Sequence, residues 1–264
     1  MSKVLATDLD GTLIPLKDNA ENAADLVRLE DAMREHKITL TFVTGRHLES
    51  VQDAITRYAL PAPDWVICDV GTSIYQRGDD GAFHIAQPYF DHLQGIVGEV
   101  STARLREEFA AFDSIRLQEE EKQGPFKLSF YCDAKQLHPV HNAVLNQLTH
   151  RQLPYSLISS VDPFTGDGLI DLLPTDVSKA YALQWWTEHA GMDNQDLVFS
   201  GDSGNDLAAM TTGYRTIVVG NASPELMETV HQHYEGRRQV DRLYIAEKHA
   251  TSGVLAGCRH FGLI

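Results

Sequence analysis

Two carboxylates one residue apart follow an apolar segment near the start of the chain. They are Asp8 and Asp10, in the stretch ATDLDGTL. In extended backbone, side chains two residues apart point to the same side, so these carboxylates would be close neighbours and would repel each other. A bound cation removes the repulsion and leaves Asp8 free to attack a phosphoryl group. Asp10 could then protonate the departing oxygen and later activate water. The segment predicts phosphoryl-transfer chemistry.

A second acidic group lies in the stretch GDSGND, which supplies Asp202 and Asp206. Four carboxylates gathered without a counter-charge would raise one another's pKa. Mg²⁺ prefers oxygen ligands in an octahedron that water and substrate phosphate complete. We therefore predict a Mg²⁺ ion held by Asp8, Asp10, Asp202 and Asp206. The alternative role for Asp206 is to cap the helix that follows it.

Phosphoryl transfer also needs donors that spread the charge of the equatorial oxygens. Thr44, before a helix expected to open at Gly45 and Arg46, offers a hydroxyl and the N–H groups of a helix N-terminus. Lys179, in DVSKAYALQWW, offers an ammonium at the start of another helix. We predict that Thr44, Gly45 and Lys179 bind phosphate. The alternatives are a helix cap for Thr44, a backbone role for Gly45 and an exposed helix position for Lys179.

These residues follow apolar segments that are typical of buried strands. Helical stretches separate the segments, and the alternation of strand and helix predicts a doubly wound α/β fold around one parallel sheet. In such sheets, ligands bind at the carboxyl ends of the strands, where Asp8, Thr44 and Asp202 are expected. The expected strands are 3–8, 38–44, 65–71, 168–174, 197–202 and 214–220.

The regular alternation of strand and helix is interrupted between residues 79 and 166. A turn in RGDDG leads to a long helix expected from Asp91, and a helix at about 135–151 is flanked by strands at 126–132 and 155–160. This part is predicted to be a small α+β insert. The core of the protein would then consist of residues 1–78 and 167–264.

Composition limits the possible partners. The 264 residues carry a formal net charge of −15, which disfavours nucleic acid, because that partner requires clustered Lys and Arg. No apolar run approaches the length of a membrane span, and the start MSKVLATD lacks the apolar core of a signal peptide. We expect a soluble, cytoplasmic protein without a membrane partner. Three widely spaced cysteines indicate neither a zinc site nor a disulfide framework.

The motifs DLDGT, FVTGR, the helical Lys179 and GDSGND together resemble those of the haloacid dehalogenase (HAD) superfamily. The resemblance implies an aspartyl-phosphate on Asp8, acid and base catalysis by Asp10, and a Mg²⁺ ligand from the Asp10 backbone carbonyl. Dehalogenases of the superfamily lack the second aspartate and P-type pumps carry threonine there. Asp10 thus indicates a phosphatase or a phosphomutase.

The insert lies between the threonine and lysine motifs, as a C2 cap does. The stretches VGTSIY, GPFKLSFYCD, VGNASPEL and TSGVLAGCRHFG resemble the sucrose-phosphate phosphatase branch, which includes phosphatases of mannosylfructose phosphate and glucosylglycerol phosphate. This likeness implies that Lys127 contacts the sugar, and Arg46 and Asn205 are further candidates. The alternatives are a solvent-facing Lys127 and an ion pair between Arg46 and a nearby acid. The cap segments FDHLQGIV and STARLREEF match no branch, so the acceptor sugar stays open.

We therefore expect a Mg²⁺-dependent phosphatase that hydrolyses a phosphorylated sugar, with a non-reducing disaccharide phosphate such as sucrose 6-phosphate as substrate. A glycosyltransferase of the same pathway is a candidate partner. Two alternatives remain: a phosphomutase of the α-phosphomannomutase kind and a subunit that binds a sugar phosphate without catalysis.

Overall fold

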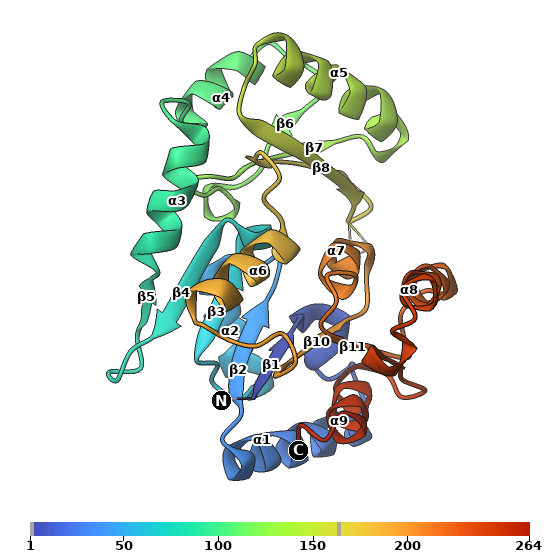
Figure 1. Ribbon diagram of the computed structural model, residues 1–264. Coiled ribbons are helices and arrows are strands. Elements are labelled where there is room, and N and C mark those ends of the chain that lie inside the picture. Colours follow the sequence, from blue (N-terminus) through green and yellow to red (C-terminus); the bar gives the residue numbers. More distant parts are fainter. Residues whose placement is uncertain (1–2, 163–164) are drawn as a thin grey trace. The chain divides into compact units, whose positions relative to one another are not determined.

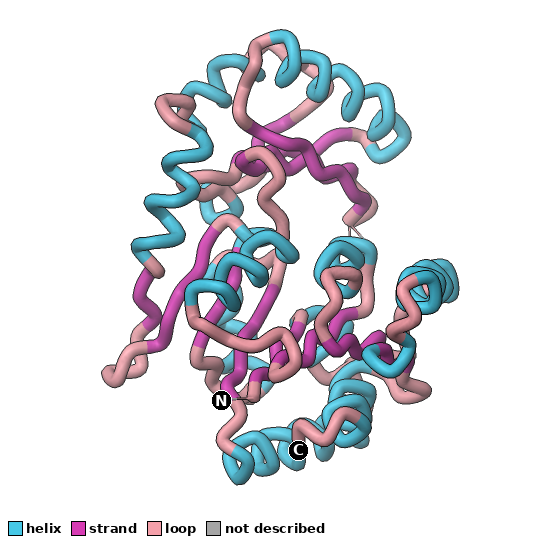
Figure 2. Tube along the Cα trace, in the orientation of Figure 1, coloured by secondary structure: helices cyan, strands magenta, loops and turns pink. Residues whose placement is uncertain are grey.

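The computed structural model describes residues 3–162 and 165–264, and the chain divides into two compact units (Figure 1). The first unit comprises Met1–His84 and Lys179–Ile264, and the second comprises Ile85–Ser178. Each unit has a sheet of its own, drawn in magenta in Figure 2. The insert expected at 79–166 falls largely in the second unit, whose limits lie later in the chain at both ends.

The first unit contains an eight-stranded sheet in the order β12-β11-β10-β1-β2-β3-β4-β5. Its first six strands in this order are parallel, β4 is antiparallel to β3, and β1 pairs with β10 on one side and β2 on the other. The carboxyl ends of β10, β1 and β2 are therefore adjacent. The strands are β1 (Val4–Thr7), β2 (Thr39–Val43), β3 (Trp65–Cys68), β4 (Ser73–Arg77), β5 (Phe83–Ile85), β10 (Leu197–Gly201), β11 (Arg215–Val218) and β12 (Leu243–Ile245).

Helices cover both faces of this sheet. Val66 on β3 belongs to a buried cluster with residues of α1, α2 and α9, whereas its neighbour Trp65 contacts Trp186 of α6. Adjacent residues of a strand point to opposite faces, so these helices lie on opposite sides, and the predicted doubly wound α/β fold is confirmed. The helices of this unit are α1 (Ala20–His36), α2 (Leu48–Tyr58), α6 (Lys179–His189), α7 (Leu207–Met210), α8 (Pro224–Gly236) and α9 (Ala250–His260).

The second unit contains a four-stranded antiparallel sheet in the order β6-β7-β9-β8. Apolar residues on one face of this sheet, such as Phe130, pack on helices, as the contact with Phe109 shows. The strands are β6 (Arg116–Leu117), β7 (Leu128–Cys132), β8 (Tyr155–Val161) and β9 (Gly168–Pro174), and the helices are α3 (Gln87–Val97), α4 (Thr102–Phe109) and α5 (Leu137–His150).

Two predictions about the second unit were wrong. Gly168–Pro174 does not join the parallel core sheet, because it pairs antiparallel with β7 and β8. Its Asp171, at the centre of an apolar run, accepts a hydrogen bond from Ser129 of β7. The long helix expected from Asp91 is two helices: α3 ends before Gly98, which has a left-handed φ of 58°, and Ser101 caps α4.

Among the described residues, no helix is long and apolar enough to cross a membrane. The three cysteines, Cys68, Cys132 and Cys258, are buried free thiols.

The close approach of two chain segments at Gly220 generates a stability prediction. A Cβ at this position would lie 2.6 Å from the carbonyl oxygen of Glu247 and 2.8 Å from that of Ala246. Both atoms belong to backbone, which yields less easily than a side chain. We expect Gly220→Ala to lower the free energy of unfolding by about 1–3 kcal/mol, measured by urea denaturation.

Gly236→Ala is the matched control, because Gly236 is the last residue of α8 and a Cβ there would meet no atom within 4 Å. This variant should raise the free energy of unfolding by at most about 1 kcal/mol, since alanine is the better helix former. Equal effects of the two variants would contradict the steric account of Gly220.

Candidate active site

A tight turn after β1 places the predicted nucleophile. Asp8 directly follows the strand, and its N–H donates to the carbonyl oxygen of Ser200 at 2.9 Å. The turn Leu9–Leu13 comes next, with Gly11 at a φ of 76°. A Cβ at Gly11 would lie 2.9 Å from Cγ of Asp202, so glycine is required both for the conformation and for the close approach.

The ammonium of Lys179 lies at the centre of the site. Its Nζ donates to Oδ1 of Asp8 at 2.7 Å, to Oδ1 of Asp206 at 2.8 Å and to Oδ1 of Asn205 at 3.1 Å. These three bonds use all the donors of an ammonium. The side chain is only 1% exposed, which excludes the alternative of an exposed helix lysine. Residues from two separate segments, the turn after β1 and the stretch Asn205–Asp206, thus share one buried cation.

The electrostatics of this group are dominated by burial. Burial raises the pKa of Asp8 to about 8 against the opposing effect of Lys179, while Asp206 adds to the rise. Burial and Asp206 raise the pKa of Asp202 to about 6. Burial lowers the pKa of Lys179, but Asp206 and Asp8 outweigh it and keep the ammonium charged. One ammonium faces three carboxylates, so an added cation would favour the ionised forms of Asp8 and Asp202.

The donor set fits a hard divalent cation. Asp8, Asp202 and Asp206 each offer one carboxylate oxygen, and these three atoms lie within 4.8 Å of one another. Carboxylate oxygens are the ligands that Mg²⁺ prefers. Asp206 is the most engaged of the three: its Oδ2 accepts from the N–H of Asp202 at 3.2 Å and of Ser203 at 3.3 Å. Its side chain completes a capping box on the short helical turn Gly204–Asp206, of which it is the last residue, but makes no cap bond to α7, so the alternative of a cap for the following helix is wrong. The role of Asp206 as a metal ligand stays a prediction.

The segment after β2 brings the predicted phosphate ligands near this group, but no helix begins at these residues. Thr44 is buried, and its Oγ1 accepts from the N–H of Arg46 at 3.2 Å. The helix expected to open at Gly45 and Arg46 begins later, at Leu48, with His47 as the N-cap. The prediction of a helix N-terminus at Gly45 was therefore wrong, as was the helix-cap alternative for Thr44. Phosphate binding by Thr44 and Gly45 stays a prediction.

Arg46 forms an ion pair with Asp10. Its Nε donates to Oδ2 of Asp10 at 2.7 Å and its Nη2 donates to Oδ1 at 2.6 Å. Nη1 donates to Oγ of Ser50 at 3.0 Å. The structure therefore contains the ion pair that was the alternative for Arg46, and the acid is the predicted general acid and base. Its contact with sugar stays a prediction.

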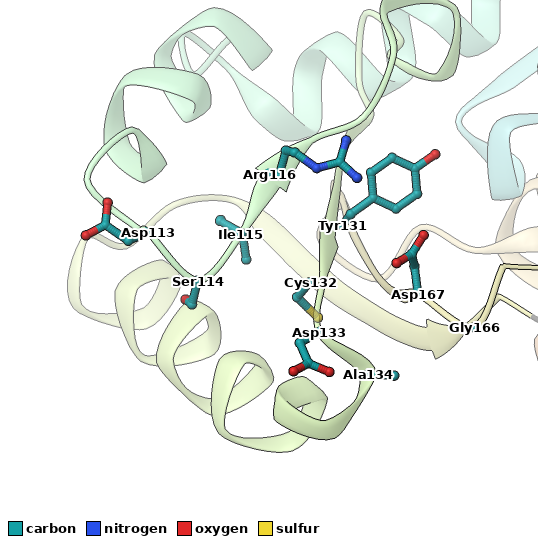
Figure 3. Close-up of a pocket in the computed structure, with 10 residues that line it drawn as sticks. All are labelled: Asp113, Ser114, Ile115, Arg116, Tyr131, Cys132, Asp133, Ala134, Gly166 and Asp167. Atoms are coloured by element: carbon teal, nitrogen blue, oxygen red, sulfur yellow. The ribbon is translucent and has the colours of Figure 1, made fainter.

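Lys127 belongs to the second unit, unlike the other predicted site residues. It precedes β7 and is 6% exposed, so the alternative of a solvent-facing lysine is wrong. A pocket of about 400 Å³ lies in the same unit (Figure 3). Arg116, Tyr131 and Asp167 contribute to its wall, with the Arg116 guanidinium 4.5 Å from the centroid of the Tyr131 ring. Lys127 does not line this pocket.

Sequence reasoning missed Asn221, which connects three segments. Its Nδ2 donates to the carbonyl oxygen of Gly11 at 2.8 Å and approaches Oδ2 of Asp202 at 3.5 Å. Its Oδ1 accepts from the N–H of Ala250, at the start of α9, at 2.7 Å. The available signal was the position of Asn221 shortly after a buried strand, in VGNASPEL. The contacts of this amide fix the glycine turn next to Asp202.

Comparisons with known proteins agree on one family. Residues 1–262 match the family described as sucrose-6F-phosphate phosphohydrolase. A protein of Nitrosococcus oceani described as a HAD-like hydrolase is 34% identical in an alignment 269 positions long, which covers 98% of this chain and 71% of that protein. The mannosylfructose-phosphate phosphatase of Agrobacterium fabrum is 27% identical over 263 residues, which are 99% of this chain and 97% of that enzyme.

A solved structure extends the likeness to the fold. The sucrose-phosphatase of Synechocystis, crystallised in complex with sucrose and phosphate, aligns with a TM-score of 0.77 at 25% sequence identity. The alignment covers 99% of both chains, so it includes both units described above.

The carboxylate group generates a prediction about metal binding. We expect Mg²⁺ to raise the melting temperature of the wild-type chain, because binding to the folded state adds stability, about 2.7 kcal/mol at a hundredfold excess over the dissociation constant. Asp202→Asn should remove most of this rise, since it replaces an anionic ligand by a neutral one. Differential scanning fluorimetry across a Mg²⁺ titration at constant ionic strength measures both.

Asp53→Asn serves as the control, because Asp53 is an exposed carboxylate on α2. It should keep the full Mg²⁺-dependent rise. If Asp202→Asn kept it as well, the carboxylate group would not be the metal site.

Proposed function

The chain belongs to the sucrose-6F-phosphate phosphohydrolase family of the HAD superfamily and is a phosphoric monoester hydrolase, and we propose that it releases phosphate from a sugar through an aspartyl-phosphate. The family likeness predicted from the motifs is confirmed. The observation that carries the proposed mechanism is the buried contact of 2.7 Å between Asp8 and Lys179 at the carboxyl end of β1, with Asp10 two residues further on.

The first half-reaction forms the covalent intermediate. A carboxylate oxygen of Asp8 attacks phosphorus, the bond from phosphorus to the sugar oxygen breaks, and Asp10 gives its proton to that oxygen. Lys179 holds the attacking carboxylate in place and keeps positive charge beside the phosphoryl oxygens. In the second half-reaction Asp10 takes a proton from water, the water oxygen attacks phosphorus, and the bond between phosphorus and the Asp8 oxygen breaks, which releases phosphate and the free carboxylate of Asp8.

A Mg²⁺ ion fits the residues present. Asp8 and Asp202 would hold it, with Asp206 beside them, and the family resemblance adds the backbone carbonyl of Asp10. When bound, the ion neutralises part of the negative charge of the phosphoryl group and of the carboxylates, which lowers the repulsion between them.

The proposed substrate is a non-reducing disaccharide phosphate such as sucrose 6-phosphate. Three findings support it: the family description, the likeness to a mannosylfructose-phosphate phosphatase, and the likeness to a phosphatase crystallised with sucrose and phosphate. We propose that the second unit, Ile85–Ser178, selects the sugar, with Lys127 from that unit and Asn205 as contributors. A glycosyltransferase partner stays a prediction.

A substrate panel with Asp8→Asn tests the proposal. The panel contains sucrose 6-phosphate, mannosylfructose phosphate, glucosylglycerol phosphate, trehalose 6-phosphate and hexose phosphates, and phosphate release is measured with Mg²⁺ present. We expect a marked preference for one disaccharide phosphate. Asp8→Asn should lower turnover by at least about a thousandfold, because an amide cannot form the covalent intermediate.

Asp53→Asn should retain full activity and provides the matched control. Similar slow release of phosphate from every ester would leave the phosphatase assignment intact but contradict the proposal of a disaccharide phosphate as substrate. Interconversion of sugar phosphates with little phosphate release would support the mutase alternative, and binding without turnover would support the non-catalytic subunit.

A further inference from the structure

The carboxylate of Asp10 is held differently from the others in the site. Asp8 and Asp206 are buried and bonded to Lys179, whereas the Asp10 side chain is 49% exposed. The described residues give the Asp10 carboxylate one charged partner, Arg46, which binds both of its oxygens at 2.6 and 2.7 Å. An exposed aspartate without such a partner would sample several rotamers, so this pair fixes its direction.

Both the backbone and the guanidinium of Arg46 are held by hydrogen bonds. Its backbone N–H donates to Oγ1 of Thr44 at 3.2 Å, and its carbonyl oxygen accepts from the N–H of Asp69 at 2.9 Å. At the tip of its side chain, Nη1 donates to the hydroxyl of Ser50 at 3.0 Å and to the Ser50 carbonyl at 3.4 Å. The guanidinium therefore connects Asp10 to the first turn of α2.

The donor inventory of Arg46 argues against a primary role in sugar binding. Guanidinium has five N–H bonds. Two of them point to Asp10 and two to Ser50, which leaves one N–H on Nη2 among the contacts of the described residues. A sugar hydroxyl could bind more of these donors only if it displaced Asp10 or Ser50.

We propose that Arg46 is a positioning residue that aims the Asp10 carboxylate at the oxygen it must serve, with Ser50 as the support of the guanidinium. This inference rests on the proposed function, in which Asp10 acts on the leaving sugar oxygen in one half-reaction and on water in the other. Loss of Arg46 should therefore slow both half-reactions with a natural type of leaving group and leave substrate binding largely intact.

The leaving group separates the two half-reactions experimentally. p-Nitrophenolate departs without a proton, so phosphorylation of Asp8 by p-nitrophenyl phosphate does not depend on Asp10, whereas hydrolysis of the intermediate does. With Arg46→Met we expect a burst of about one equivalent of p-nitrophenol per chain, followed by a steady state slowed about 10- to 100-fold. With sucrose 6-phosphate, kcat should fall by a similar or larger factor and KM should change less than about threefold.

Matched variants identify the cause. Ser50→Ala should act in the same direction but by less than about tenfold, because Asp10 keeps its partner. Arg46→Lys keeps the positive charge but cannot form the bidentate hydrogen bonds to Asp10, so it should recover only part of the rate. Millimolar guanidinium chloride, with sodium chloride as the salt control, should partly restore Arg46→Ala. Arg57→Met, which changes an exposed arginine on α2, the helix that carries Ser50, should behave as wild type.

Three results would overturn the inference in different ways. A raised KM for sucrose 6-phosphate with unchanged turnover of p-nitrophenyl phosphate would assign Arg46 to sugar binding. Unchanged kinetics with both esters would deny it any role. Absence of turnover of either ester by the wild-type chain would contradict the proposed function itself and the positioning role with it, and thermal melting of each variant reveals loss of folding.

Discussion

The buried ammonium of Lys179 makes the site possible. Asp8 and Asp206 come from different ends of the chain, and both carboxylates are almost without contact with water. Two buried negative charges at this spacing would repel each other strongly, and removal of the cation from such a group typically costs about 3–5 kcal/mol. Lys179 therefore allows the acids that follow β1 and β10 to lie close together, and burial restricts the carboxylate of Asp8, the proposed nucleophile, to one position.

Close backbone packing supplies the rest of the precision. Gly11 lets the turn after β1 approach the Asp202 carboxylate, Thr12 donates to that carboxylate at 3.0 Å, and Asn221 ties the turn to the start of α9. The contacts of Thr12 with Asp202 and of Asn221 with Gly11 join residues about two hundred positions apart in sequence, whereas Asn221 and Ala250 are 29 positions apart. Rigid parallel strands make this practical, because their carboxyl ends meet at one edge of the sheet.

Asp10 works under a different constraint. In the proposed mechanism Asp10 serves both a departing oxygen and an incoming water, and this requires access to solvent and substrate. Its side chain is accordingly half exposed, whereas that of Asp8 is buried. The partner of Asp10 is the partly exposed guanidinium of Arg46, which Ser50 anchors to α2, and not the buried ammonium of Lys179. The site thus divides into a buried group of charged residues around Lys179 and an accessible pair, Asp10 and Arg46, to which the proposed mechanism assigns the proton transfers.

The sequence by itself determined the fold class, the family and the order of the acidic motifs. This was possible because apolar segments that end in Asp8, Thr44 or Asp202 report strand ends directly. Other features depended on tertiary structure: the membership of Gly168–Pro174 in the second sheet, the burial of Lys127, the pair between Arg46 and Asp10, and the contacts of Asn221. These features arise from strand order, register and contacts between distant segments. Local periodicity reports the burial of a segment but not the neighbour against which it is buried.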